Sequence, residues 1–162
     1  KLKQITFWTM GSLNGSTYAN ALALAAAFAI FGGILFIKAR ELNAFAVGED
    51  NARNIGVDVK KTKLTVLICV SALIGVCVSI GGTIAFVGLV TPHAARFIAG
   101  PNHRRLLSAS AFAGAIFLML CDLAARTLLS PLELPIGVVT SLIGAVAFII
   151  IFYRARGKSG RA

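Results

Sequence analysis

Few side chains in this 162-residue sequence could take part in metal or thiol chemistry. His93 and His103 lie ten residues apart, and no cysteine, carboxylate or second histidine stands at ligand spacing from His93, so we expect no metal site. The three cysteines lie inside apolar stretches without C-x-x-C spacing, and we interpret them as small buried side chains. They are Cys69, Cys77 and Cys121.

The remaining candidates for catalysis are equally weak. Gly157-Lys158-Ser159 resembles the end of a phosphate-binding loop, but Phe152 stands where that loop needs its first glycine, and no strand pattern precedes it. An intramembrane enzyme needs a nucleophile paired with a base, and the sequence offers no such pair. We therefore expect a protein without catalytic residues, cofactor or ATPase motif.

The composition indicates a membrane protein. Hydrophobic residues make up 57% of the chain and charged residues only 14%, against about 25% charged residues in soluble domains. The net charge of +10 comes from basic residues that gather at the ends of apolar stretches, as they do in cytoplasmic membrane loops. No basic stripe carries interleaved aromatic residues, so membrane lipid is the expected environment and nucleic acid is not an expected partner.

Four stretches carry almost no charge and can supply membrane-spanning helices. They are residues 18–37, 64–95, 106–121 and 134–153. Crossing a hydrocarbon core takes about 20 apolar residues, whereas residues 64–99 would form a single helix of roughly 54 Å. Gly81-Gly82 in the middle favours a turn, and basic clusters flank the stretch on both sides. Two crossings keep both clusters inside.

These features predict an all-α, polytopic transmembrane helical bundle of about five crossings. The crossings are expected at about 18–38, 64–80, 83–99, 105–127 and 135–153. Pro92 is expected to bend the short third crossing. Of the sixteen lysines and arginines, this topology leaves only Lys1, Lys3 and Arg126 outside, and it places the C-terminus in the cytoplasm.

The one substantial loop, residues 41–63, shows a helical pattern of apolar positions broken by Gly48 and Gly56. One or two short amphipathic helices are expected there, with Glu49 and Arg53 on the polar side. Such a loop can rest on the membrane surface or dock a cytoplasmic partner, and the pattern alone favours the membrane surface.

Several motifs together resemble the FecCD-type permeases of ABC importers. They follow one another along the whole chain at family-like spacing: a Trp-x-Met-Gly segment at 8–11, the loop sequence at 42–57, Phe-Val-Gly-Leu and Pro-His elements within 82–93, a turn at 100–107, and residues 122–126 with 133–140. One departure stands at Val146, near which the family usually has a proline midway along the last helix. Its loss is expected to leave this helix straighter.

The resemblance implies a single transmembrane permease domain over residues 1–162, N-terminally truncated, that forms roughly the last five crossings of a ten-helix subunit. It implies import of iron-siderophore, haem or cobalamin-type chelates across the bacterial inner membrane, powered by separate ABC ATPase subunits. The other implied partners are a periplasmic or lipid-anchored substrate-binding protein and a second permease subunit, in a homodimer or a heterodimer. Residues 41–63 become the cytoplasmic coupling loop.

The resemblance also assigns roles to individual residues. Coupling to the ATPase falls to Ala46, Gly48, Glu49, Ala52, Arg53 and Gly56. Docking of the binding protein falls to Arg126, although Asp122 lies four residues earlier and can pair with it on one helical face. The last crossing is assigned to the pathway and subunit interface, although small and hydroxyl residues serve plain helix packing equally well. Its assigned residues are Pro135, Gly137, Thr140, Ser141 and Gly144.

Half of an ion-coupled secondary transporter is the alternative. Such proteins usually place ionisable residues or broken helices near the membrane midplane. Here Asp122 is the one acidic residue inside a predicted crossing, and it lies near the outer end of that crossing. The sequence therefore argues against ion coupling.

Overall fold

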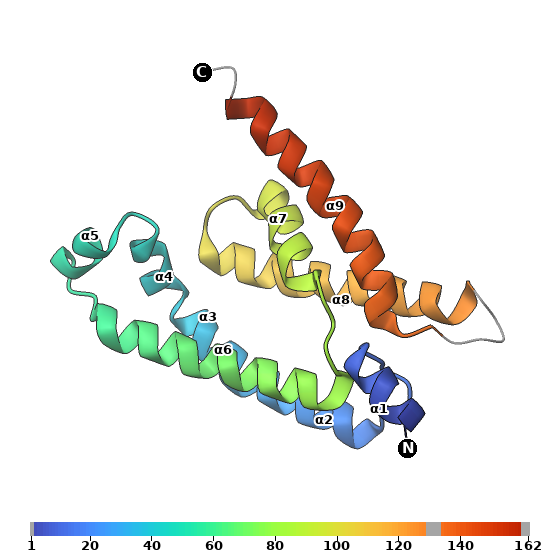
Figure 1. Ribbon diagram of the computed structural model, residues 1–162. Coiled ribbons are helices and arrows are strands. Elements are labelled where there is room, and N and C mark those ends of the chain that lie inside the picture. The colour runs from blue at the N-terminus through green and yellow to red at the C-terminus, as the bar shows by residue number, and fades with distance from the viewer. Residues whose placement is uncertain (1, 129–133, 160–162) are drawn as a thin grey trace.

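Every regular element in the computed structural model is a helix, within the described residues 2–128 and 134–159 (Figure 1). Within these described residues, three helices are long and apolar enough to cross a membrane. They are α6 (Val59–Gly81), α8 (His103–Thr127) and a continuous helix of α2 (Tyr18–Ala27), a π-helical turn (Phe28–Gly32) and α3 (Gly33–Ile37). The predicted all-α, polytopic membrane fold is confirmed.

Side-chain caps explain where two of these helices begin. Asp58 accepts a hydrogen bond from the backbone N–H of Lys61, so α6 starts at Val59, ahead of the predicted crossing at 64–80. Asn102 accepts one from the backbone N–H of Arg104 and starts α8. The loop expected at 41–63 therefore ends at Asp58, because its last residues already form the first turn of α6.

The crossing predicted at 83–99 is shorter than expected. Gly82–Phe86, which we term the linker, is not helical, and α7 (Val87–Ala99) has 13 residues. A helix of that length rises about 20 Å, less than the roughly 30 Å of a hydrocarbon core. Gly82 and Phe86 have φ values of 69° and 66°, and these positive angles interrupt the helix at both ends of the linker.

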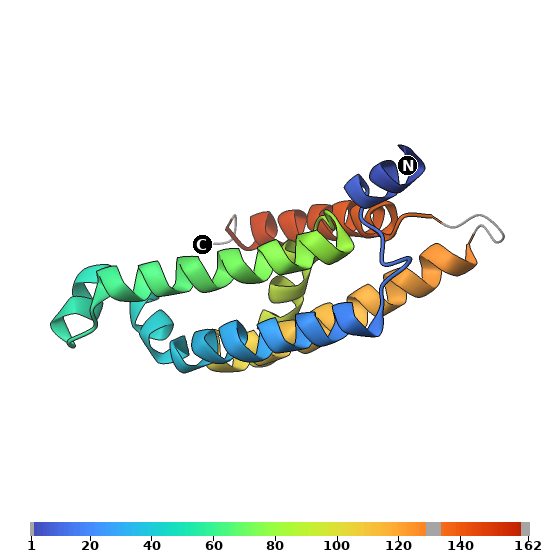
Figure 2. The same ribbon diagram turned by 90° about the horizontal axis from the view of Figure 1, so that it is seen from below.

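The long helices run side by side between two ends of the molecule (Figure 2). One end, the loop end, carries α4 (Ala39–Phe45) and α5 (Glu49–Asn54). The opposite end, the core end, carries α1 (Leu2–Thr9) and the start of α9 (Ile136–Ser159). The chain has returned to the loop end by Asn102, whose side chain contacts α4, so the predicted reversal after Gly81-Gly82 is confirmed.

A small apolar core joins the last two helices at the core end. Cys121 and Ala125 of α8 pack with Ile136 of α9, and all three are almost completely buried. Leu13, which precedes α2, and Ile84 of the linker pack against them. The N-terminal segment, the linker, α8 and α9 are therefore one packed unit, which fixes the position of α9.

Candidate functional site

The loop end carries a pair of short helices, as the glycine-broken pattern predicts. α4 and α5 are joined by Ala46–Gly48, and the chain then turns into α6 over Ile55–Asp58. Gly48 and Gly56 have φ values of +117° and +85°, which glycine adopts readily and residues with a Cβ rarely do. The two turns therefore require glycine for their own geometry, whatever the loop contacts.

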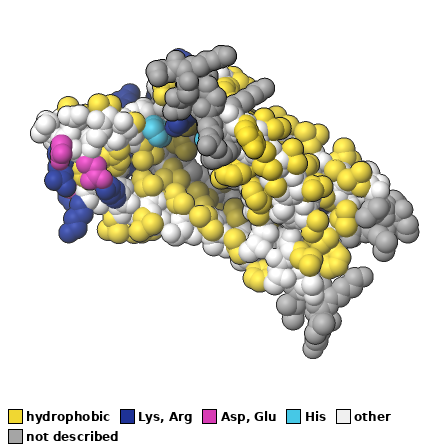
Figure 3. Space-filling view, turned by 45° about the horizontal axis from the view of Figure 1, so that its top comes forward, with side chains coloured by type: hydrophobic (Ala, Val, Ile, Leu, Met, Phe, Trp, Pro, Cys, Tyr) yellow, Lys and Arg dark blue, Asp and Glu magenta, His cyan; other side chains and the backbone are white. Residues whose placement is uncertain are grey.

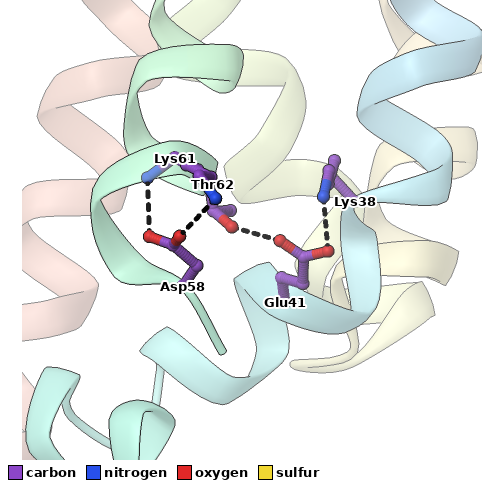
Figure 4. Close-up of polar contacts among 5 residues, drawn as sticks. All are labelled: Lys38, Glu41, Asp58, Lys61 and Thr62. Atoms are coloured by element: carbon purple, nitrogen blue, oxygen red, sulfur yellow. Dashed lines mark hydrogen bonds and ion pairs between the residues drawn. The ribbon is translucent and has the colours of Figure 1, made fainter. Parts of the chain in front are cut away.

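Glu41 fastens α4 to α6 (Figure 4). One of its carboxylate oxygens lies 2.6 Å from Nζ of Lys38, and the other accepts a hydrogen bond from the buried hydroxyl residue Thr62. The hydrogen bond from Lys38, and then the one from Thr62, hold the pKa of Glu41 below its ordinary value. The base of the loop is thus tied to a membrane-spanning helix by a part-buried polar contact.

Two ion pairs lie where the loop enters α6. Lys63 of α6 pairs with Glu49 of α5, and Nζ of Lys61 lies 3.2 Å from the carboxylate of Asp58. The hydrogen bond from Lys63 lowers the pKa of Glu49, and the backbone hydrogen bond from Lys61 lowers that of Asp58. Because these side chains are about half exposed or more, the pairs add little stability. The pair of Lys63 with Glu49 serves mainly to orient α5, whereas that of Lys61 with Asp58 lies within the start of α6.

The six residues assigned to ATPase coupling are divided by their burial. Ala52 is completely buried, and the other five are exposed. Val47 and Ile55, which the family resemblance did not assign, are each 71% exposed beside Glu49 and Arg53 in the sequence. Figure 3 shows charged side chains of both signs gathered over this end of the molecule. Exposed apolar side chains among charges are suited to docking a protein partner.

A second polar contact ties α4 to the membrane helices, and the sequence gives little sign of it. Asn43 of α4 contacts Asn102 and His103, which begin α8 and lie about sixty residues further along the chain. Asn102 has a recognisable signal, because an asparagine directly before an apolar helix is a preferred N-cap. Asn43 has none, since its partner is set only by the fold.

We expect the contact between Glu41 and α6 to weaken only at acidic pH. Because the pKa of Glu41 is lowered in the folded chain, its carboxylate contributes full stability above the unfolded-state pKa of a glutamate. That contribution is lost as the pH falls through the lower folded-state pKa. Hydrogen-exchange protection of α4 across this acidic range measures the effect. Glu41→Gln should abolish the pH dependence, and equal protection of the wild type at all acidic pH values would contradict the contact.

At the core end, Arg126 is paired within its own helix. Its Nε lies 2.8 Å from Oδ2 of Asp122, which confirms the local pairing expected from their spacing. The Arg126 side chain is still half exposed, and it lines a small hollow with Ser12 and Ile136. A guanidinium has five N–H donors, so Arg126 can keep Asp122 and still offer donors to an approaching acidic surface.

The residues of α9 assigned to the pathway are packed within this chain. Pro135 and Gly137 are buried, and a Cβ placed at Gly137 would lie 2.0 Å from the carbonyl oxygen of Met10. Thr140 is completely buried, and its hydroxyl donates to the carbonyl of Gly137, as does that of the half-buried Ser141. These positions therefore carry helix packing here, and a role in lining a pathway stays a prediction.

Gly144 brings α9 close to Phe86, the last residue of the linker. A Cβ placed at Gly144 would lie only 2.2 Å from the Cβ of Phe86. Other positions of α9 point away from the chain and are exposed and apolar, among them Val138, Leu142 and Val146. At Val146, where the sequence departs from the family proline, α9 continues as regular α-helix.

Comparison with known proteins gives consistent matches. Residues 1–154 match the family model described as the FecCD transport family. The chain is 43% identical over 161 residues to an uncharacterized ABC transporter permease protein, YvrB, of Bacillus subtilis, and 40% identical over 157 residues to the hemin transport system permease protein HmuU of Yersinia pestis. It is 41% identical over 154 residues to the vitamin B12 import system permease protein BtuC of Vibrio vulnificus.

A solved structure shows the same fold. It is a metal-chelate type ABC transporter in an inward-facing conformation, with a TM-score of 0.89 and 35% sequence identity over 94% of this chain and 49% of that one. The three relatives are matched over 99%, 96% and 95% of this chain, but over only 45%, 47% and 46% of their own lengths. The chain thus spans about half the length of the curated relatives it matches.

Proposed function

This chain belongs to the FecCD transport family, and we propose that it is part of the permease subunit of an ABC importer, powered by a separate ATPase. The family is one of transport proteins, and the similar proteins are named for the transport of hemin and vitamin B12 and for a metal-chelate type transporter. The proposed cargo is a chelate of that class, a haem, a cobalamin or an iron-siderophore. The permease supplies the path, and ATP hydrolysis takes place on its partner.

The main structural support for this proposal is the way in which the two short helices of the loop end are held to the membrane helices. α5 is oriented by the pair between Glu49 and Lys63, and α4 is tied to α6 by Glu41. The result is an exposed helix pair that is fastened to the membrane helices at its base. A force applied to α5 by a closing ATPase can therefore be delivered to those helices as a rigid-body movement.

The distribution of charge sets the proposed orientation. The basic residues near the loop end include Arg40, Arg53, Lys60, Arg96 and Arg105, and a basic surface favours the cytoplasmic side. The loop end and the C-terminus then face the cytoplasm and the ATPase. The core end faces outward, and Arg126 there contacts acidic residues of a substrate-binding protein.

The exposed apolar surfaces fit a larger assembly. The three long helices bury few of their side chains, and a groove of about 900 Å³ between the α2–α3 helix, α6 and α8 is lined mainly by apolar side chains such as Phe28, Leu73 and Phe112. We propose that the further transmembrane helices of the longer polypeptide cover part of this surface. The exposed face of α9 is the proposed contact with the pathway and the second permease subunit.

The proposal is tested by co-purifying the full-length permease polypeptide, which we propose contains this chain and which we term the parent, with a candidate ABC ATPase. Glu49→Arg reverses a charge on α5 and breaks its pair with Lys63, and Gly56→Pro cannot adopt the φ of +85° that this turn requires. Both should lower the recovered ATPase about tenfold or more, because charge reversal and loss of docking geometry each cost on the order of 1.4 kcal/mol or more of binding. Ser16→Arg, which introduces the same arginine side chain at an exposed site near the core end, is the control.

Equal ATPase recovery with Glu49→Arg, Gly56→Pro and the wild type would remove the loop from the proposed interface. Failure of any ABC ATPase to bind the wild type, together with uptake that follows an ion gradient, would favour an ion-coupled secondary transporter instead. Loss of binding with Ser16→Arg as well would indicate a general effect of added charge, and would also count against the loop.

A further inference from the structure

The N-terminus of α8 is capped twice, and one cap comes from the coupling loop. The first backbone N–H groups of a helix have no partner inside it and need an acceptor from elsewhere. Oδ1 of Asn102 lies 3.0 Å from the backbone nitrogen of Arg104, as a local N-cap does. Oδ1 of Asn43, from α4, lies 2.8 Å from the backbone nitrogen of His103. The second cap is thus a bond between two separate elements.

The same asparagine makes two further contacts. Its Oδ1 lies 2.8 Å from Nδ1 of His103, which donates when that nitrogen carries the proton, and its Nδ2 donates to Oδ1 of Asn102 at 3.3 Å. Oxygen and nitrogen of the one amide are therefore both used, so that Asn43 is bonded to both Asn102 and His103. We refer to Asn43, Asn102 and His103 as the amide joint.

The amide joint has a counterpart on the same short helix. Glu41, two residues before Asn43, is bonded to Thr62 in the first turn of α6. α4 therefore connects the loop-end termini of two membrane-spanning helices, α6 through Glu41 and α8 through Asn43. Arg104 of α8 also stacks over the ring of Phe36 in α3, with its guanidinium carbon 5.0 Å from the ring centre. At this level, polar side chains link α4 to α6 and α8, and a cation–π contact links α8 to α3.

The need to cap α8 does not by itself explain the hydrogen bonds of the Asn43 side chain. The helix already has its own N-cap in Asn102, whereas the side-chain hydrogen bonds of Asn43 join α4 to Asn102 and His103 at the start of α8. α7 and α8 pack closely along each other, and Phe86, the linker residue directly before α7, meets α9 at Gly144. A displacement of α4 that is passed through the amide joint can therefore reach the helices that contact α9.

We propose that Asn43 is a positioning residue for transport, which makes α4 and the start of α8 move as one body when the ATPase displaces the coupling loop. This inference rests on the proposed function, because it assumes that α5 receives the ATPase. It assigns to Asn43 a role in the transmission of movement and not in the binding of the ATPase. Loss of the joint should uncouple ATP hydrolysis from transport while the complex stays assembled.

The test compares Asn43→Ala with Asn43→Asp in the full-length parent, reconstituted with its ABC ATPase and binding protein in liposomes. Asp keeps the oxygen that accepts from His103 but loses the Nδ2 donor to Asn102, whereas Ala removes both. The uptake of radiolabelled hemin or cobalamin per ATP hydrolysed should fall about fivefold or more in Asn43→Ala. About fivefold is the lower end of the range expected when the coupling free energy between two sites is lost. Asn43→Asp should retain most of this ratio. Asn20→Ala removes the same amide from the far end of the α2–α3 helix and should match the wild type.

A second measurement follows the distance between α4 and α8, which the amide joint connects, and needs no transported substrate. Spin labels are placed at Arg40→Cys on α4 and Arg105→Cys on α8, two exposed positions outside the joint, in a parent whose native cysteines are replaced. The distance between the labels should stay the same when the ATPase complex is trapped with vanadate, and should change or broaden in Asn43→Ala. If Asn43→Ala accumulates poorly, Asn102→Ala, which removes the acceptor for Nδ2 of Asn43, and His103→Ala, which removes the ring contact but keeps the backbone donor, take its place.

The outcomes separate the two proposals. If no ATPase complex forms with the wild type, the proposed function fails, and the distance between the labels in the isolated parent still shows whether Asn43 holds α4 to α8. If the complex forms and Asn43→Ala keeps both the transport ratio and the distance of the wild type, the amide joint has no part in coupling. An equal loss in Asn43→Asp and Asn43→Ala would likewise overturn the assigned role of the shared oxygen.

Discussion

Replacing Gly82 by alanine is expected to prevent the full-length parent from accumulating as a folded protein. Gly82 ends α6 with φ of 69° and ψ of −162°, a backbone region that is essentially restricted to glycine. A Cβ there would also lie 1.9 Å from the carbonyl oxygen of Trp8, a backbone atom that cannot rotate away. Strain and overlap together should cost about 3 kcal/mol or more, a large share of a typical folding free energy.

The measurement is the fraction of parent protein that remains monodisperse in detergent, together with its apparent Tm. Gly75→Ala is the matched control, because Gly75 lies within α6 and no atom of the described chain lies within 4 Å of a Cβ placed there. Alanine at this helical position should be neutral or stabilising by up to about 1 kcal/mol. Similar accumulation of both variants would show that the close approach of Trp8 to the start of the linker is dispensable.

The membrane fold could be predicted from the sequence because its signal is local. Long apolar stretches and basic flanks identified the spanning helices, and Gly81-Gly82 marked the reversal. The short α7 could not be predicted, since its start is set by Phe86, a bulky residue at positive φ. Nothing in an isolated sequence places a phenylalanine in a left-handed conformation, and only the packing of the linker on α9 explains it.

The candidate site could be predicted in part for the same reason. Gly48 and Gly56 are recognisable as breaks, and the four-residue spacing of Asp122 and Arg126 gives their ion pair. Contacts between distant segments leave no such pattern. Asn43 and its partners at the start of α8 are sixty residues apart, and their contact becomes visible only once α4 is placed beside that helix.

The residues of α9 show how one sequence pattern can serve two purposes. Small residues at Gly137 and Gly144 fit a pathway or a close helix contact equally well when only the sequence is read. The structure places both against other parts of the chain, with the linker and the segment around Met10 as neighbours. We therefore expect any pathway that α9 borders in the full protein to face its exposed apolar side, which includes Leu142 and Val146.

The contact between Gly144 and Phe86 should show strong energetic coupling. Gly144→Ala is expected to destabilise the parent by about 2–3 kcal/mol, because the new Cβ would overlap the Cβ of Phe86, which is fixed by the backbone. Phe86→Gly removes that atom and the cost of a non-glycine residue at a φ of 66°, about 1–2 kcal/mol. The double variant should therefore be more stable than Gly144→Ala alone, by roughly 1–2 kcal/mol.

Apparent Tm values of the two single variants, the double variant and the wild type complete the cycle. Gly33→Ala, where a Cβ would meet nothing within 4 Å of the described chain, controls for a methyl group added to a membrane helix. Additive effects of Gly144→Ala and Phe86→Gly would contradict a direct contact. Coupling would instead establish that Phe86, directly before α7, sets the distance between the linker and α9. The overlap that Gly144→Ala creates is relieved only when the Cβ of Phe86 is removed.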